Sequence, residues 1–102
     1  MDSLGSPPWF DGTSFQQWKI LMESHLQAKD LNVWRVTSEG MKNKGQQEKQ
    51  FDAIAKCVIL SSLDDKIFNR VFACENAKDL WKTICENHEG TKDVGEKNTM
   101  LS

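Results

Sequence analysis

Residues 76–90 read NAKDLWKTICENHEG, and this stretch decides the fold. Asn76 followed by Asp79 is a pattern that starts a helix, because a short polar side chain accepts a hydrogen bond from the first turn of the backbone. One helical face then carries, at intervals of three or four positions, Ala77, Leu80, Trp81, Ile84, Cys85 and His88. Gly90 suits the left-handed position that ends a helix. We therefore predict an amphipathic helix that ends at Gly90.

Two further helices are predicted immediately before this stretch. The first runs from about Gln46 to about Ser61, with an apolar face that consists of Phe51, Ile54, Ala55, Val58 and Ile59. Ser62 followed by Asp65 indicates a new helix start, with Ile67, Phe68, Val71 and Phe72 on the apolar face of a short helix. The adjacent carboxylates of Asp64 and Asp65 fit a role at the start of this helix better than a catalytic acid and base.

The N-terminal third of the chain contains one more clear helical pattern. Thr13 and Gln16 have the spacing of a capping box, and a helix from about Ser14 to Ala28 follows. Its apolar face consists of Phe15, Trp18, Leu21, Met22, His25 and Leu26. The next segment, residues 31–36, alternates for only six residues, so it is either an extended link or a short helical turn, and we interpret it as a connector. Residues 38–49 are polar with two glycines and are predicted to form a loop.

An extended arm precedes the first helix. Pro7 and Pro8 force extended backbone, yet Trp9 and Phe10 follow at once, and large aromatic side chains gain from burial. Trp9, Phe10 and Trp34 all fall outside the helical stripes. They either close the core of their own bundle or form an exposed patch that binds a partner. We name these three as the candidate interaction residues.

A chain of 102 residues has the size of one domain. We divide it into an arm (1–12), a helical lobe (13–90) and the truncated start of a further helix or a linker (91–102). The predicted core consists of Phe15, Trp18, Leu21, Leu26, Ile54, Val58, Phe68, Leu80, Trp81 and Ile84.

Charge and cysteine content exclude several classes of partner. The 13 Lys and Arg against 15 Asp and Glu give a net charge of -2, which disfavours nucleic acids and anionic membranes. No aromatic residue is interleaved among Lys42, Lys44, Lys49 and Lys56, so we interpret these lysines as a solvated surface rather than an RNA site. Three cysteines make no disulfide framework, which favours the cytoplasm. We expect no membrane association.

The pattern of thiols and imidazoles does not favour catalysis or metal binding. Cys85 and His88 lie three residues apart, and with His25 and Cys57 they are an alternative zinc site. Structural zinc sites normally show two close ligand pairs, and this chain has one. A cysteine hydrolase would also need an orienting third group. We therefore expect buried, unreactive thiols, no cofactor, no metal and no enzymatic activity.

Three sequence blocks point to a family. They are residues 8–19 (PWFDGTSFQQWK), residues 30–34 (DLNVW), and residues 77–91 with AKDLWKTI followed by HEGT. In this order they resemble the Gag polypeptide of copia-type LTR retrotransposons. Phe15 and His88 stand where that family commonly has tyrosine, so contacts made by those hydroxyls are not carried over. The family's zinc knuckle, which binds RNA, is not among these residues.

The resemblance implies an all-α orthogonal bundle of four to five helices, similar to the N-terminal domain of retroviral capsid proteins. In such Gag proteins this lobe packs against copies of itself in a particle shell, so the expected partner is a second copy, bound weakly. Domesticated relatives use the equivalent lobe to bind short peptides or partner proteins in a hydrophobic groove, which is the alternative.

Overall fold

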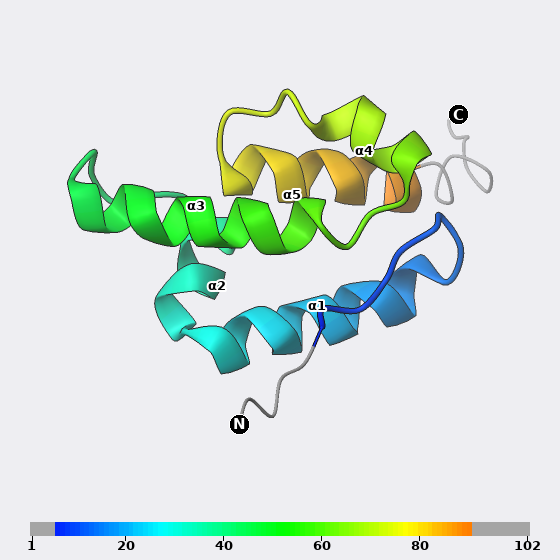
Figure 1. Cartoon of the computed structure of the whole chain (residues 1–102), viewed down its shortest axis with the longest axis horizontal. Coiled ribbons are helices and arrows are strands. Elements are labelled where there is room, and N and C mark those ends of the chain that lie inside the picture. Colours follow the sequence, from blue (N-terminus) through cyan, green and yellow to red (C-terminus); the bar gives the residue numbers. More distant parts are fainter. Residues whose placement is uncertain (1–5, 91–102) are drawn as a thin grey trace, which may run out of the picture.

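In the computed structural model, which describes residues 6–90, the chain forms a series of helices joined by short loops (Figure 1). These elements are α1 (Phe15–Lys29), α2 (Leu31–Ser38), α3 (Gln46–Leu60), α4 (Asp65–Val71), α5 (Ala77–Cys85) and a π-helical turn, η1 (Glu86–Gly90). Within residues 6–90 there is no strand, only an isolated parallel bridge between Phe10 and Leu63. The all-α prediction is confirmed. The expected helix start or linker at 91–102 lies outside the described residues.

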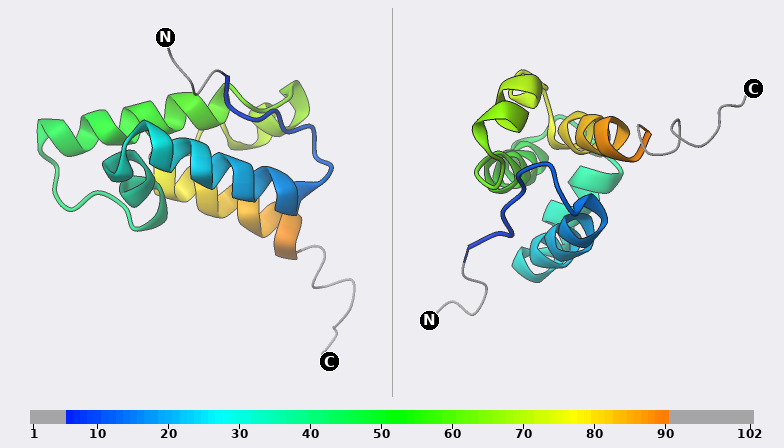
Figure 2. Two further views of the ribbon diagram at one scale, coloured as in Figure 1. Left: turned by 90° about the horizontal axis from the view of Figure 1, so that it is seen from below. Right: turned by 90° about the vertical axis from the view of Figure 1, so that its right-hand side faces the viewer.

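The longest helices form the body of the bundle. α1, α3 and α5 lie side by side, with α1 running opposite to the other two (Figures 1 and 2). The short α2 contacts α1, α3 and α5, and α4 packs on α5. Asp52 of α3 accepts a hydrogen bond from the backbone N–H of Ala77 at 2.8 Å and is buried. This bond satisfies an N–H at the start of α5 that has no partner within the helix.

Side-chain caps determine where two of the helices begin. Asn76 accepts from the Asp79 N–H at 2.8 Å, as the sequence predicts. The cap of α4 is Asp64, which accepts from the Ile67 N–H at 3.1 Å. The expectation that Ser62 begins this helix is wrong, because Ser62 is buried and its hydroxyl donates to the Ile59 carbonyl at 2.6 Å. Ser62 therefore closes the end of α3.

Of the two forms left open for the connector at residues 31–36, the structure shows the helical one, and the segment is a helix in its own right, α2. Asp30 is extended, which separates α1 from α2, and its carboxylate accepts from the Asn32 N–H at 2.8 Å. An aspartate cap of this kind satisfies an N–H group that the first turn leaves free. The alternation at residues 31–36 therefore belongs to a short helix with a side-chain cap.

The capping box predicted at the start of α1 is also absent. The Thr13 hydroxyl donates to Asp11 at 2.6 Å, and Ser14 occupies the N-cap position without a side-chain cap bond. Ser14 is left-handed, with φ 53° and ψ 47°. The arm turns back along α1 at this point, and that reversal takes the place of the expected cap.

Most of the predicted core side chains are buried against one another. The buried ones are Phe15, Trp18, Leu26, Val58, Leu80, Trp81 and Ile84. Ile54 is half-buried and packs against this cluster. The predicted burial of Leu21 and Phe68 is wrong, because these side chains are 50% and 37% exposed. Leu21 lies at the edge of the apolar face of α1, and in α4 the buried positions are taken by Ile67 and Val71.

An ion pair joins α2 to the loop before α3 and to the first turn of α3. Arg35 donates two hydrogen bonds to the Glu48 carboxylate, at 3.0 and 2.8 Å. The Lys42 N–H donates to the same carboxylate at 2.9 Å. The Arg35 guanidinium, and then the Lys42 N–H, lower the pKa of Glu48 to about 2. Such bidentate pairs are the stronger kind of charged hydrogen bond.

The lowered pKa of Glu48 predicts that acid weakens the fold. In the unfolded chain Glu48 binds a proton near its ordinary pKa of 4.5, whereas the folded chain resists protonation down to about 2. The unfolded state therefore binds more protons in this range, and the free energy of unfolding falls as the pH falls from about 5 to 2. Urea unfolding at pH 7 and pH 3 measures this loss. Glu48→Gln should show a smaller loss; an equal loss would contradict the assignment.

Candidate interaction surface

Phe10 fastens the arm to the bundle through its backbone. Its N–H donates to the Ser62 carbonyl at 2.8 Å, and its carbonyl accepts from the Asp64 N–H at 3.0 Å. Figure 2 shows the arm passing between α1 and the corner that joins α3 to α4. These bonds explain the bridge seen between the arm and this corner.

The Phe10 ring lies at the centre of an aromatic cluster. The ring stacks on Trp18, with centroids 4.6 Å apart, and meets the edge of the His88 ring at 4.8 Å. His88 also stacks on Phe15, at 5.5 Å. The Trp18 indole N–H donates to the Pro8 carbonyl at 3.0 Å. Burial, and then the charge of Arg70, lower the pKa of His88, which favours its neutral form in this cluster.

Phe10 is therefore a core residue of its own bundle, with 1% of its surface exposed. This corrects its prediction as an anchor on the free surface. Of the two roles that the sequence left open, Phe10 takes the one that closes the core. The ring is available to a neighbouring molecule only if the arm leaves its position between α1 and the α3–α4 corner.

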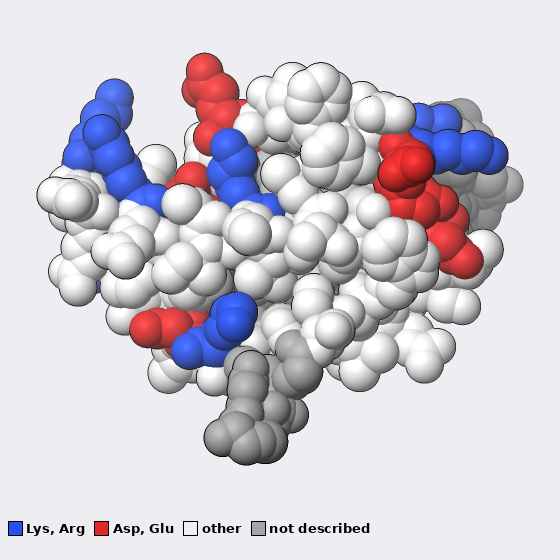
Figure 3. Space-filling view, in the orientation of Figure 1, with Lys and Arg blue, Asp and Glu red and all other residues white. Residues whose placement is uncertain are grey.

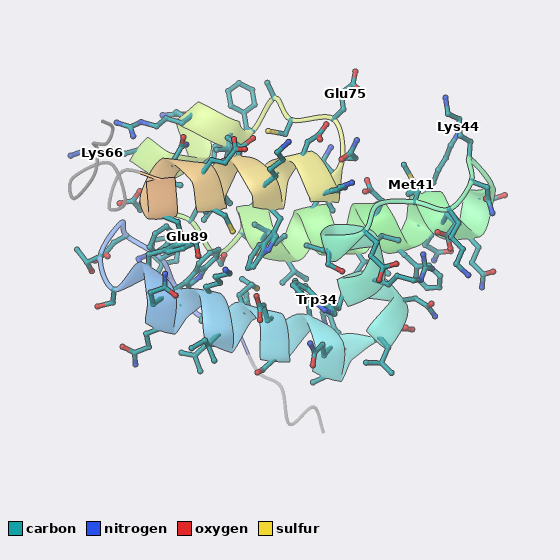
Figure 4. The ribbon with its side chains drawn as sticks, turned by 180° about the vertical axis from the view of Figure 1, so that it is seen from behind. Trp34, Met41, Lys44, Lys66, Glu75 and Glu89 are labelled. Carbon is teal, nitrogen blue, oxygen red and sulfur yellow. The ribbon has the colours of Figure 1, made fainter. Side chains whose placement is uncertain are left out.

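The structure also moves Trp34 from a connector to a helix. Its ring meets the Trp81 ring edge-on, with centroids 5.7 Å apart, and packs half-buried against the core. Figure 4 shows Trp34 extending from α2 toward α5. Trp34 is thus part of the packing between α2 and α5, which corrects its placement outside the helical stripes.

Trp9 is the one candidate interaction residue whose side chain is largely exposed, at 63%. It lines a hollow of about 380 Å³ between the arm and α1, together with Pro8, Gln17 and Leu21. A second hollow of about 410 Å³ shares Pro8 and Leu21 and extends along α1 to Ala28. We call the two together the arm–α1 groove. It is an open, mainly apolar surface with an exposed indole at its rim.

A second apolar surface lies on α4. Phe68 and Phe72 stack on each other with centroids 5.7 Å apart and nearly parallel rings, and Phe72 is 55% exposed. Uncharged side chains gather over α4 and the adjoining part of α3 in Figure 3. The sequence held a signal for this pair. A helix as short as α4 carries two apolar pairs, Ile67 with Val71 and Phe68 with Phe72, and only one of them faces the core.

The Cys85 thiol is not activated as a nucleophile. Burial raises the pKa of the Cys85 thiol to about 11, so this thiol is protonated at neutral pH. Cys57 is exposed, which corrects the expectation that all the thiols are buried, and Cys74 is half-buried. Among residues 6–90, no three His, Cys, Asp or Glu side chains lie close enough together to hold a metal ion.

The arm–α1 groove and the α4 surface are thus the two places in residues 6–90 where large apolar side chains lie exposed beside a hollow or beside each other. Across the described part of the chain, no helix combines the length and the apolar character needed to cross a bilayer. Residues 22–102 match the family model described as the gag-polypeptide of LTR copia-type. Comparison with curated proteins and with solved structures gives no match. The matched range covers α2 to η1 and the second half of α1, and the arm and the first half of α1 precede it.

Proposed function

Because this chain belongs to the gag-polypeptide family of LTR copia-type elements, we propose that it is a capsid-like lobe that self-associates in a retrotransposon particle shell. Family membership supports a structural role rather than catalysis. The observation that carries the proposal is the exposed Trp9 indole beside Leu21, on an arm that is otherwise anchored. Buried aromatic anchors dominate the energy of protein interfaces, and an exposed one is available to become such an anchor.

The proposed partner is a second copy of the chain, bound weakly. A shell holds its subunits through many contacts at once, so each contact need not be strong. The net charge of -2 gives no support to nucleic-acid or membrane binding by this lobe. The free thiols suit the cytoplasm, where disulfides are rare.

Sedimentation from micromolar to millimolar protein tests this proposal. We expect a monomer when dilute and a rising mass at high concentration. Trp9→Ala should weaken the association by at least about tenfold, as expected for an interface anchor. Ile20→Ala is the control, since Ile20 is 61% exposed but lines neither hollow of the groove. A strictly monomeric profile for the unmodified chain would reject self-association.

The alternative is a groove that accepts a short peptide or a partner protein. The specific observation in its favour is the arm–α1 groove, which is mainly apolar along α1 and has polar groups such as Asp11 and Gln17 beside Trp9. A strictly monomeric chain whose tryptophan fluorescence changes on titration with apolar peptides, with a smaller change in Trp9→Ala, would favour this alternative.

A further inference from the structure

The hinge between the arm and α1 is held in an unfavourable backbone conformation. Gly12 has φ 100° and Ser14 has φ 53°. Glycine adopts positive φ without cost, but a residue with a Cβ is strained there. The Ser14 side chain makes no cap bond that would offset this strain. Both residues lie where the arm folds back onto its own α1.

Residues at this hinge also have the sequence pattern of a helix start, but the structure does not use it. Thr13 and Gln16 have the spacing of a capping box, which requires Ser14 to adopt helical angles. In the structure Thr13 instead bonds Asp11, and the Gln16 amide donates to Glu89 at 3.4 Å. An arm that did not fold back would allow α1 to begin at Ser14 with a proper cap. In the closed form, in which the arm lies on its own bundle, the favourable cap by Thr13 is therefore not formed.

The docking site of the arm does not depend on which chain supplies the arm. Phe10 is held by two backbone hydrogen bonds, to Ser62 and Asp64, and by its ring contacts with Trp18 and His88. All of these contacts are non-covalent and lie beyond the hinge. An arm from a second copy would therefore make the same contacts, and the hinge alone would differ.

We propose that two copies of this chain associate by exchanging the arm residues 6–10, so that Phe10 of each copy occupies the site between α1, η1 and the α3–α4 corner of the other copy. This inference rests on the proposed self-association and names a second contribution to it, beside contact through the exposed Trp9. Exchange of an identical element is a low-cost route to a dimer, because no new interface is needed. Hinge residues 11–14 span roughly 13 Å when extended, which lets the arm leave the Phe10 site of its own bundle.

Nuclear magnetic resonance on a concentrated mixture of isotope-labelled and unlabelled chain tests the exchange directly. The Phe10 and Trp18 ring centroids are 4.6 Å apart, close enough for a nuclear Overhauser effect between their protons. We expect this effect between labelled and unlabelled molecules, at a concentration where sedimentation shows dimers. Its absence in a sample that is dimeric would overturn arm exchange and leave self-association intact. A chain that stays monomeric overturns both.

Two hinge substitutions provide an independent test, with effects of opposite sign. Ser14→Gly removes the strain of the closed form and should weaken dimerisation by about tenfold. Gly12→Ala introduces strain into the closed form and should strengthen dimerisation by about tenfold. The nearest atom to a Cβ at Gly12 is Ile67 Cδ1, at 3.8 Å, so no clash contributes.

Ser14→Ala is the matched control for these substitutions, because it keeps a Cβ at the left-handed position. It should leave the dimer dissociation constant unchanged. Association through the outer surface of Trp9 or the α4 surface alone, without exchange of the arms, predicts no effect from any of the three. Equal dissociation constants for all three variants would therefore rule out exchange.

Discussion

Replacing Trp81 by alanine is expected to lower the free energy of unfolding by about 3–5 kcal/mol. The indole is 7% exposed and contacts two other indoles, Trp18 at 5.5 Å and Trp34 at 5.7 Å between ring centroids. Removing it leaves a cavity at the point where α1, α2 and α5 meet. The free energy of unfolding of a small domain is only about 5–15 kcal/mol, so this single substitution removes a large part of it.

Trp9→Ala is the matched control, because it makes the same chemical change at a side chain that is 63% exposed. It should cost less than about 1 kcal/mol, as exposed substitutions usually do. Urea unfolding, followed by circular dichroism at a concentration where both variants are monomeric, compares the two. A cost below about 1 kcal/mol for Trp81→Ala would show that the orientation of α5 is wrong.

Phe10→Ala is expected to cost about 3–5 kcal/mol, which is the usual range for a buried phenylalanine. Its ring is 1% exposed and contacts Phe15, Trp18 and His88. The loss should also release the arm, because the ring is its main apolar anchor. Phe72→Ala is the control, since this phenylalanine is 55% exposed.

Hydrogen exchange distinguishes release of the arm from general loss of stability. The Asp64 N–H donates to the Phe10 carbonyl, whereas the Leu80 N–H donates to Asn76 within α5. In Phe10→Ala the Asp64 N–H should lose far more protection than the Leu80 N–H. Equal losses at both would mean that the arm and the bundle unfold together, and the idea of a separable arm would be wrong.

Helix positions that depend on local patterns were predictable from the sequence. The bounds of α1 and α3 agree with the predicted ones to within a residue, and Asn76 caps α5 as expected. Periodicity and capping act over a single turn, so the residues that encode them are neighbours in the sequence. The same reasoning failed at α2, where too few residues were present to show a helical period.

The burial of individual side chains was less predictable, because it depends on which element covers them. Leu21 lies on the apolar edge of α1, but the arm leaves it half exposed. Phe68 belongs to one of two apolar pairs on α4, and the pattern alone does not say which pair faces inward. For the candidate site, the sequence singled out Trp9 but did not show that Phe10 is buried.

The capping box at Thr13 failed for a different reason. The local pattern is present, but the chain reverses at Gly12 and Ser14 to bring Phe10 into its groove. Burial of that ring and two backbone hydrogen bonds outweigh one helix cap, which is worth about 1 kcal/mol. A local preference thus gives way to a tertiary contact that links the arm to residues far along the chain.

The position of the arm has a consequence for synthesis on the ribosome. Phe10 is translated before Trp18, Ser62 and His88, the residues that enclose it in the finished domain. At about 5–20 residues per second, roughly 4–16 s pass between the addition of Phe10 and that of His88. Throughout that interval the ring has no complete groove to enter. The arm is therefore made before the residues that enclose it, and a nascent chain carries an uncovered aromatic anchor until η1 has emerged.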